Sequence, residues 1–342
     1  MTRIGILGAG STVAIADRHA RAFARLPGCR VSAVCSRSLQ SCRRLAAAAG
    51  LQQALLTTDP AAFFEQADAV VICTPDSTHL AYACRAAALG KPVLLEKPLG
   101  LRFAAPGQLE QLLAAPAPVM VGYVYRYAQG VQWLRRLVAE SLGPVWLFDA
   151  MQGGHRLADP TLPVEWRMQK AQAAGGALAD FGSHLLDLAR FTAGIELQQA
   201  AGWGEVFIPS RPAGADGAAR VDNSDAFVFC GRGRQGQLCS FTTSRVGLDG
   251  VHLQVSGQGG LARLHLEAGQ GWYWPKAPQG AYLPARQAQT VAFADGPQQW
   301  FDRQAADFAR LAQGQAVDCC TLRAAAQSER LLEELAAAGA AR

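Results

Sequence analysis

The chain has 342 residues, which is long for one compact core and short for three, so we expect two domains. Half of the residues are hydrophobic and 17% are charged, which excludes an intrinsically disordered chain. The net charge of +5 comes from scattered arginines without a basic block, which argues against a nucleic-acid partner.

The first 122 residues alternate short apolar runs with helical patterns. Strands are expected at residues 3–7, 30–35, 69–73, 93–96 and 119–123. Helices are expected at residues 16–26, 39–49 and 79–89. Such alternation requires crossover connections, so it predicts an α/β fold whose N-terminal domain, residues 1–122, is a doubly wound parallel sheet.

The rhythm changes after residue 122. Helical patterns cover 131–140 and 182–192, and β-like runs follow without intervening helices at 225–230, 237–244, 252–256 and 262–266. The segment 211–220 is rich in Pro, Gly and Ala and is expected to be a loop, while 299–337 is expected to be helical with a break near Gly314. We therefore predict a second domain, residues 123–342, of the α+β type with a large open mixed or antiparallel sheet.

The cysteines and the N-terminus bear on the compartment. Nine cysteines form no Cys-x-x-Cys pair, so we expect reduced thiols and no metal site. The N-terminal apolar run is too short for a signal peptide, and nowhere do 18 apolar residues follow one another. We expect a cytoplasmic protein without a membrane partner.

A dinucleotide turn is predicted at Gly8-Ala9-Gly10, directly after the first strand. The first glycine permits a tight bend, and the second lets backbone amides approach a pyrophosphate. The position usual for a third glycine is Val13, and Ala16 takes that role after a longer loop. The hydroxyls of Ser11 and Thr12 are then available to the phosphates.

The end of the second strand discriminates between cofactors. An acidic residue there would hold the ribose diol of NAD, but this chain has Ser36-Arg37-Ser38, with Arg43 and Arg44 on the following helix. Guanidinium groups and hydroxyls suit a 2′-phosphate, so we expect NADP(H) more than NAD(H). The alternative is an ordinary solvated arginine.

Two further motifs follow strands. Thr74-Pro75, with Asp76 and His79 after it, and Glu96-Lys97-Pro98 both lie where open α/β sheets bind ligands. Lys97 can serve as an acid or base, because burial tunes a lysine but not an arginine. The alternatives are a turn with a helix cap and a surface lysine.

The segment 175–187 combines glycines with titratable side chains. On one helix Asp180 and His184 would lie at i and i+4 on the same face, where the carboxylate could orient the imidazole. Asp187 could do the same. The alternative is an N-capping Asp180 with a buried, backbone-bonded His184.

Taken in order, these motifs resemble the Gfo/Idh/MocA family of oxidoreductases. The matching pieces are Gly8-Ala9-Gly10, Thr74-Pro75 with His79, Glu96-Lys97-Pro98, Gly122-Tyr123 leading to Arg126, Trp166-Arg167, and Gly175-Gly176 with Asp180, Gly182 and His184. The resemblance covers residues 1–192 well and the remainder only in general pattern. Departures are the enlarged loop at residues 11–13 and Asp76, where the family often has Asn.

The resemblance implies a Rossmann domain, a second domain whose sheet often forms the oligomer interface, and an active site in the cleft between them. Lys97 would hydrogen-bond the reacting oxygen, and the bond before Pro98 could be cis. His184 would be the general acid/base, oriented by Asp180. The implied substrate contacts are Arg126, Trp166, Arg167 and His184. The motifs and the resemblance together give the expected cofactor contacts, which are Gly8, Gly10, Ser11, Thr12, Ser36, Arg37, Thr74, Pro75, His79, Glu96 and Lys97.

These expectations describe an NAD(P)(H)-dependent dehydrogenase or reductase that transfers hydride between a nicotinamide and a secondary alcohol or ketone of a sugar-like or cyclic polyol. We expect a homodimer or homotetramer. Three rivals stay open: a glycoside hydrolase that uses bound NAD as a transient oxidant, a dinucleotide-sensing regulator, and an interaction protein that uses its exposed sheet. Intact Lys97, Asp180 and His184 count against the regulator.

Overall fold

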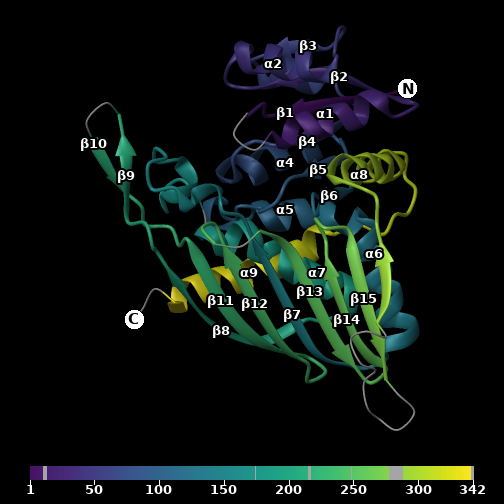
Figure 1. Ribbon diagram of the computed structural model, residues 1–342. Helices are drawn as coiled ribbons and strands as arrows, with labels where there is room; N and C mark the ends of the chain where they lie inside the picture. Colours follow the sequence, from purple (N-terminus) through teal and green to yellow (C-terminus); the bar gives the residue numbers. More distant parts are fainter. Residues whose placement is uncertain (11–13, 174, 215–216, 248, 277–287, 340–342) are drawn as a thin grey trace. The chain divides into compact units, whose positions relative to one another are not determined.

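The computed structural model describes residues 1–10, 14–173, 175–214, 217–247, 249–276 and 288–339 (Figure 1). Contacts divide the chain into two units. The first comprises Met1–Val124 and Pro297–Gln327, and the second comprises Tyr125–Gly296 and Ser328–Arg342. The N-terminal unit therefore also contains a segment from near the end of the chain.

The first unit is built on a six-stranded sheet with the order β3-β2-β1-β4-β5-β6. Every pairing in it is parallel, which confirms the predicted doubly wound sheet. The order reverses between β1 and β4, the switch point where such sheets bind ligands. The strands are β1 (Thr2–Leu7), β2 (Cys29–Cys35), β3 (Leu55–Thr57), β4 (Ala69–Ile72), β5 (Val93–Leu95) and β6 (Val119–Val121).

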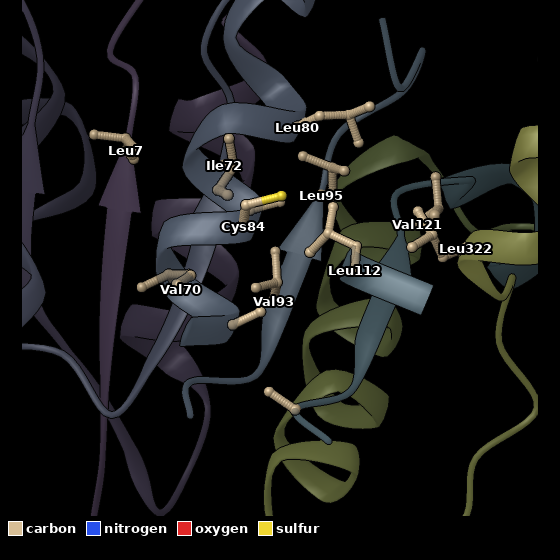
Figure 2. Close-up of a cluster of buried hydrophobic side chains, with 14 of the residues drawn as sticks. Leu7, Val70, Ile72, Leu80, Cys84, Val93, Leu95, Leu112, Val121 and Leu322 are labelled. Carbon is tan, nitrogen blue, oxygen red and sulfur yellow. The ribbon is translucent and has the colours of Figure 1, made fainter. Parts of the chain in front are cut away.

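Helices connect these strands: α1 (Ile15–Arg25), α2 (Leu39–Ala49), α3 (Pro60–Glu65), α4 (His79–Ala88) and α5 (Gln108–Ala114). The 3₁₀ turns η1 (Asp76–Thr78) and η2 (Leu101–Phe103) follow β4 and β5. β4 and β5 are apolar throughout because both faces of a parallel sheet are covered, and all of their residues are buried. Figure 2 shows the resulting core, in which Ile72, Leu95 and Val121 of the sheet lie with Leu80 and Cys84 of α4.

Two helices from the end of the chain contribute to this unit: α8 (Pro297–Ala312) and the start of α9 (Leu322–Gly339). α8 packs on α1, where the rings of Phe23 and Phe308 meet edge to face at 6.0 Å and those of His19 and Phe301 at 4.8 Å. Leu322 of α9 is buried in the core of Figure 2.

The second unit contains an eight-stranded sheet with the order β16-β15-β14-β13-β7-β12-β11-β8. Its pairings are antiparallel except for β7 with β12, so the predicted mixed sheet is confirmed. The strands are β7 (Val145–Gly153), β8 (Leu197–Glu205), β11 (Ala226–Gly233), β12 (Leu238–Ser244), β13 (Gly250–Gly257), β14 (Gly260–His265), β15 (Gln270–Pro275) and β16 (Gln289–Ala292).

The two faces of this sheet differ. Phe148, Phe229 and Phe241 are buried on one face, which α6 (Gln129–Leu137) and α7 (Ser183–Ala193) contact. On the other face, Trp203 of β8 and its cross-strand partner Val228 of β11 are 57% and 50% exposed. The sheet is therefore open on that side within the unit.

The structure corrects one prediction about this unit. Residues 211–220, expected to be a loop, contain most of a two-stranded antiparallel hairpin of β9 (Ser210–Ala213) and β10 (Gly217–Arg220). Arg211, 1% exposed, anchors it by donating hydrogen bonds to the carbonyls of Leu157 and Asp159. Backbone pairing and this buried anchor outweigh the weak strand preference of Pro, Gly and Ala.

The described residues include no helix that is both long and apolar enough to cross a membrane.

Candidate functional site

The dinucleotide residues predicted in the first unit follow the carboxyl ends of four neighbouring strands. Gly8 and Gly10 follow β1, Ser36-Arg37 follow β2, Thr74-Pro75 follow β4, and Glu96-Lys97 follow β5. Parallel strands end at a common edge, so the topology brings these segments to one side of the sheet. The predicted phosphate contacts Ser11 and Thr12 lie outside the described residues.

The two glycines of the turn meet different physical constraints. Gly8 has φ +101°, and a Cβ there would lie 2.5 Å from the carbonyl oxygen of Cys73. Gly10 has no described atom within 4 Å of such a Cβ. Among the described residues, packing and conformation thus require glycine at position 8 but not at position 10. The space at Gly10 fits the close approach of a dinucleotide pyrophosphate.

The arginines near the end of β2 divide into two kinds. Arg44 on α2 donates to both carboxylate oxygens of Asp17, at 2.7 and 2.9 Å, and to the carbonyl of Ala9. The hydrogen bonds that Arg44 donates to Asp17 raise the pKa of Arg44, and together with the bond to Ala9 they hold α2 beside the glycine turn. Arg37 is exposed at the strand end, with half-buried Ser36 before it.

His79 is the first residue of α4 and is 2% exposed. Its Nδ1 lies 2.6 Å from the carbonyl oxygen of Pro98, and its Nε2 lies 2.8 Å from that of Thr74. Both ring nitrogens already face backbone carbonyls. A direct polar contact with a dinucleotide would have to replace one of them.

The two charged side chains of the Glu96-Lys97-Pro98 motif have different surroundings. Glu96 is buried, and its Oε1 lies 2.8 Å from Nε2 of His19 on α1, while its Oε2 accepts the N–H of Lys97 at 3.3 Å. Gly122 leaves room for this carboxylate, because a Cβ there would lie 2.9 Å from Oε1. Lys97 is half-buried, and its peptide bond to Pro98 is cis, as the resemblance allowed.

In the second unit, His184 lies on α7 and is 7% exposed. The ring of Tyr125 lies against it, with centroids 4.4 Å apart and planes tilted by 42°. The Tyr125 hydroxyl accepts a hydrogen bond of 2.9 Å from Nε2 of Gln152 on β7. Burial raises the pKa of Tyr125, so this hydroxyl keeps its proton over the physiological range.

Asp180 has a partner that the sequence analysis missed. It lies in a π-helical turn, η7 (Leu178–Gly182), and α7 begins only after this turn, so the α-helical i, i+4 spacing to His184 does not apply directly. Nε and Nη2 of Arg245 donate to Oδ2 of Asp180 at 3.1 and 2.5 Å. Arg245 directly follows β12, and its position at a strand end was the only signal that the sequence offered.

Arg126 and Asp187 form a buried ion pair. Nε and Nη2 of Arg126 donate to the two oxygens of Asp187 at 2.8 and 2.6 Å, and the side chains are 7% and 2% exposed. The guanidinium also lies 4.7 Å from the ring centroid of Phe191. Both Asp187 oxygens are engaged with Arg126, which holds α7 to the turn η3 (Val124–Tyr127).

Trp166 and Arg167 occupy the 3₁₀ turn η6 (Trp166–Met168). The Arg167 guanidinium lies 4.2 Å from the Trp166 ring centroid, and burial lowers the pKa of Arg167. Its Nη1 is buried without a hydrogen-bond partner among the described residues. The carbonyl of Arg167 accepts a bond of 2.9 Å from Arg245, so Arg245 holds both this segment and Asp180.

Two family models match the chain in succession. Residues 2–123 match an oxidoreductase family model with an NAD-binding Rossmann fold, and residues 131–263 match the GFO/IDH/MocA C-terminal domain. Together they account for well over half of the chain. The match confirms the resemblance and the expectation of an oxidoreductase that binds a nicotinamide dinucleotide.

Individual proteins agree with this. The chain is 29% identical to inositol 2-dehydrogenase of Acidiphilium cryptum over 77% of this chain and 73% of that protein. It is 32% identical to levoglucosan dehydrogenase of Pseudarthrobacter phenanthrenivorans over 44% of this chain but only 38% of that protein. Among solved structures, levoglucosan dehydrogenase in complex with NADH and levoglucosan has a TM-score of 0.87 at 21% identity, over 99% of this chain and 97% of that one. An oxidoreductase domain protein from Kribbella flavida has the same TM-score at 24% identity, over 100% and 98%. At these identities the solved structures establish the fold alone. The two family models show that the chain belongs to the Gfo/Idh/MocA family of oxidoreductases.

Proposed function

We propose that the protein is an NAD(P)(H)-dependent dehydrogenase that interconverts a secondary alcohol and a ketone on a sugar or cyclic polyol. The observation that carries the proposal is the pair of candidate acid/base groups in this member of the family. Lys97 follows β5 of the Rossmann sheet, and the buried His184 lies beside Tyr125. The names of the relatives, levoglucosan dehydrogenase and inositol 2-dehydrogenase, support the substrate class.

The proposed chemistry divides among few side chains. When bound, the nicotinamide supplies hydride transfer to or from the reacting carbon. Lys97 donates a hydrogen bond to the reacting oxygen and stabilises negative charge that develops there. His184 takes up or returns the proton of that oxygen, since an imidazole titrates near neutral pH. Asp180, which accepts hydrogen bonds from Arg245, orients His184 in this proposal.

The proposed cofactor is NADP(H) in preference to NAD(H). Arg37 supports this, because it is exposed at the end of β2, where no acidic residue is present to hold a ribose diol. Arg44 does not contribute, because Asp17 and Ala9 occupy it. Ser36 and Arg37 are the proposed contacts of the 2′-phosphate.

A homo-oligomer is proposed from the open face of the eight-stranded sheet. Trp203, Val228, Leu147 and Leu238 alternate outward on this face and are each 45–57% exposed. Such an apolar surface favours association with a second copy. Light scattering coupled to size exclusion tests this, and a monomer at micromolar concentration would contradict it.

The experiment that tests the function starts with nucleotide affinity. NADPH and NADH are titrated against the fluorescence of the seven tryptophans, and a panel of inositols, anhydrosugars and aldoses is then assayed for nucleotide reduction. His184→Ala and Lys97→Ala should each lower kcat by about 10² or more while nucleotide binding by His184→Ala is retained. Wild-type turnover in both variants would refute the assigned roles. Glycoside cleavage without net nucleotide turnover would favour the hydrolase, and binding without any turnover would favour the regulator.

A further inference from the structure

The buried imidazole of His79 connects two segments of the dinucleotide edge. Thr74 belongs to the segment after β4, and Pro98 belongs to the segment after β5 that carries Lys97. The ring lies between them, 2.6 Å from one carbonyl oxygen and 2.8 Å from the other. These are the lengths of full hydrogen bonds.

The donor count of the ring decides how many of these bonds form. A neutral imidazole carries one N–H, and a carbonyl oxygen can only accept, so a neutral ring bonds one carbonyl and turns a lone pair toward the other. A second proton satisfies both. Burial lowers the pKa of His79, whereas the two carbonyls and the charges of Asp76 and Glu96 favour the cation. Asp76 comes from η1 and Glu96 from the end of β5, and both are buried.

The same two segments also meet at a second point. Gly100, with φ +77°, passes so close to the carbonyl of Asp76 that a Cβ would lie 2.1 Å from the oxygen. Nearby, the Thr78 hydroxyl donates to the carbonyl of Pro75 at 2.9 Å. The segments after β4 and β5 are therefore in direct contact, and His79 provides a polar connection between them.

We propose that His79 is a positioning residue that joins the Thr74 and Pro98 segments, and that a proton on its second ring nitrogen completes the join. The inference rests on the proposed role of Lys97 and deepens it, because the joined segments carry Thr74-Pro75 and Lys97. A dinucleotide that needs both segments in place binds more tightly to the protonated form. By linkage, dinucleotide binding then favours uptake of a proton by His79.

The test compares wild type with His79→Gln. A glutamine side chain has its donors on one nitrogen, so it cannot serve two carbonyls on opposite sides of a ring. NADH affinity is measured by tryptophan fluorescence between pH 5.5 and 8.5. Wild type should bind more tightly as the pH falls, and His79→Gln should bind about tenfold more weakly at the acid end, a change of ~1.4 kcal/mol, with a flatter pH profile. His155→Gln, at an exposed position in the second unit, is the matched control and should behave as wild type.

Equal affinity and equal pH dependence in wild type and His79→Gln would overturn the inference. If the His79→Gln variant unfolds, NMR of the ring N–H protons of His79 in the wild-type protein tests the inference instead. Two slowly exchanging N–H signals from the His79 ring at acid pH, and one at alkaline pH, would support the join. A ring that keeps a single N–H throughout would overturn it. Failure of wild type to bind any nicotinamide nucleotide would instead refute the proposed function, and the NMR result would still test the join.

Discussion

Replacing each glycine of the dinucleotide turn by alanine should separate packing from ligand binding. At position 8 the substitution meets two penalties. A side chain at φ +101° costs about 1–3 kcal/mol, and relieving a Cβ placed 2.5 Å from the Cys73 carbonyl costs a similar amount. We expect Gly8→Ala to lose about 3 kcal/mol of stability. For a unit of this size, that corresponds to roughly 6–12 °C in Tm.

At position 10 the expectation reverses. The added methyl group meets no described atom, and alanine reduces the entropy of the unfolded chain, so stability should stay constant or rise by about 0.4–1 kcal/mol. Affinity for NADPH or NADH should fall at least about tenfold, because the methyl occupies the space that a pyrophosphate would take.

Thermal unfolding by circular dichroism and nucleotide titration by tryptophan fluorescence measure both effects on the same samples. The decisive comparison is between the two variants: Gly8→Ala should lower the Tm, whereas Gly10→Ala should lower the nucleotide affinity and not the Tm. Gly8→Ala with an unchanged Tm, or Gly10→Ala with an unchanged affinity, would refute the reasoning for that glycine. A loss of stability in Gly10→Ala would show that the turn is closed by protein atoms after all.

Three further predictions follow from other contacts. Arg37→Ala should weaken NADPH binding by about tenfold or more and leave NADH binding unchanged, as separate titrations will show; an equal loss for both nucleotides would contradict a 2′-phosphate contact. Arg245→Met should lower the free energy of unfolding, measured in urea, by about 2–3 kcal/mol. This is less than for a fully buried ion pair, because the Asp180 side chain is 28% exposed. Arg245→Lys should restore part of the loss, and identical unfolding curves for wild type and Arg245→Met would contradict the pairing. A thiol reagent at pH 8 should modify exposed Cys230 before Cys35, because burial raises the pKa of Cys35 to about 11 and keeps it protonated. Mass spectrometry of the labelled peptides gives the order, and labelling of Cys35 before Cys230 would contradict it.

The first unit could be predicted well because its information is local. Apolar runs such as 69–72, buried on both faces, stand out from the helical patterns beside them, and the predicted helix 39–49 agrees with α2 at both ends. β3 and α3 were missed, because three-residue and six-residue elements carry little periodicity. The segment Pro297–Gln327 belongs to this unit through contacts with α1 and the core, and no local sequence pattern predicts those contacts.

The second unit was harder to predict. β7, which lies between β12 and β13 in the sheet, was missed because the exposed Trp146 and Leu147 and the buried Gln152 blur its alternation of apolar and polar residues. In the candidate site, the residue types were predictable, but their partners were not. Arg245 comes to Asp180 from 65 residues along the chain, and Arg126 comes to Asp187 from 61. Such pairs depend on the tertiary fold, which a single sequence does not display.

The packing of α8 on α1 has a consequence for synthesis of the chain. The ribosome makes Phe23 early, yet its partner Phe308 emerges only when nearly the whole chain has been translated. Until then α1 exposes apolar surface that a chaperone could hold. A nucleotide-binding fragment cut after residue 124 would carry the same exposed patch, so an excised version should be built by fusing residues 297–327 to its end.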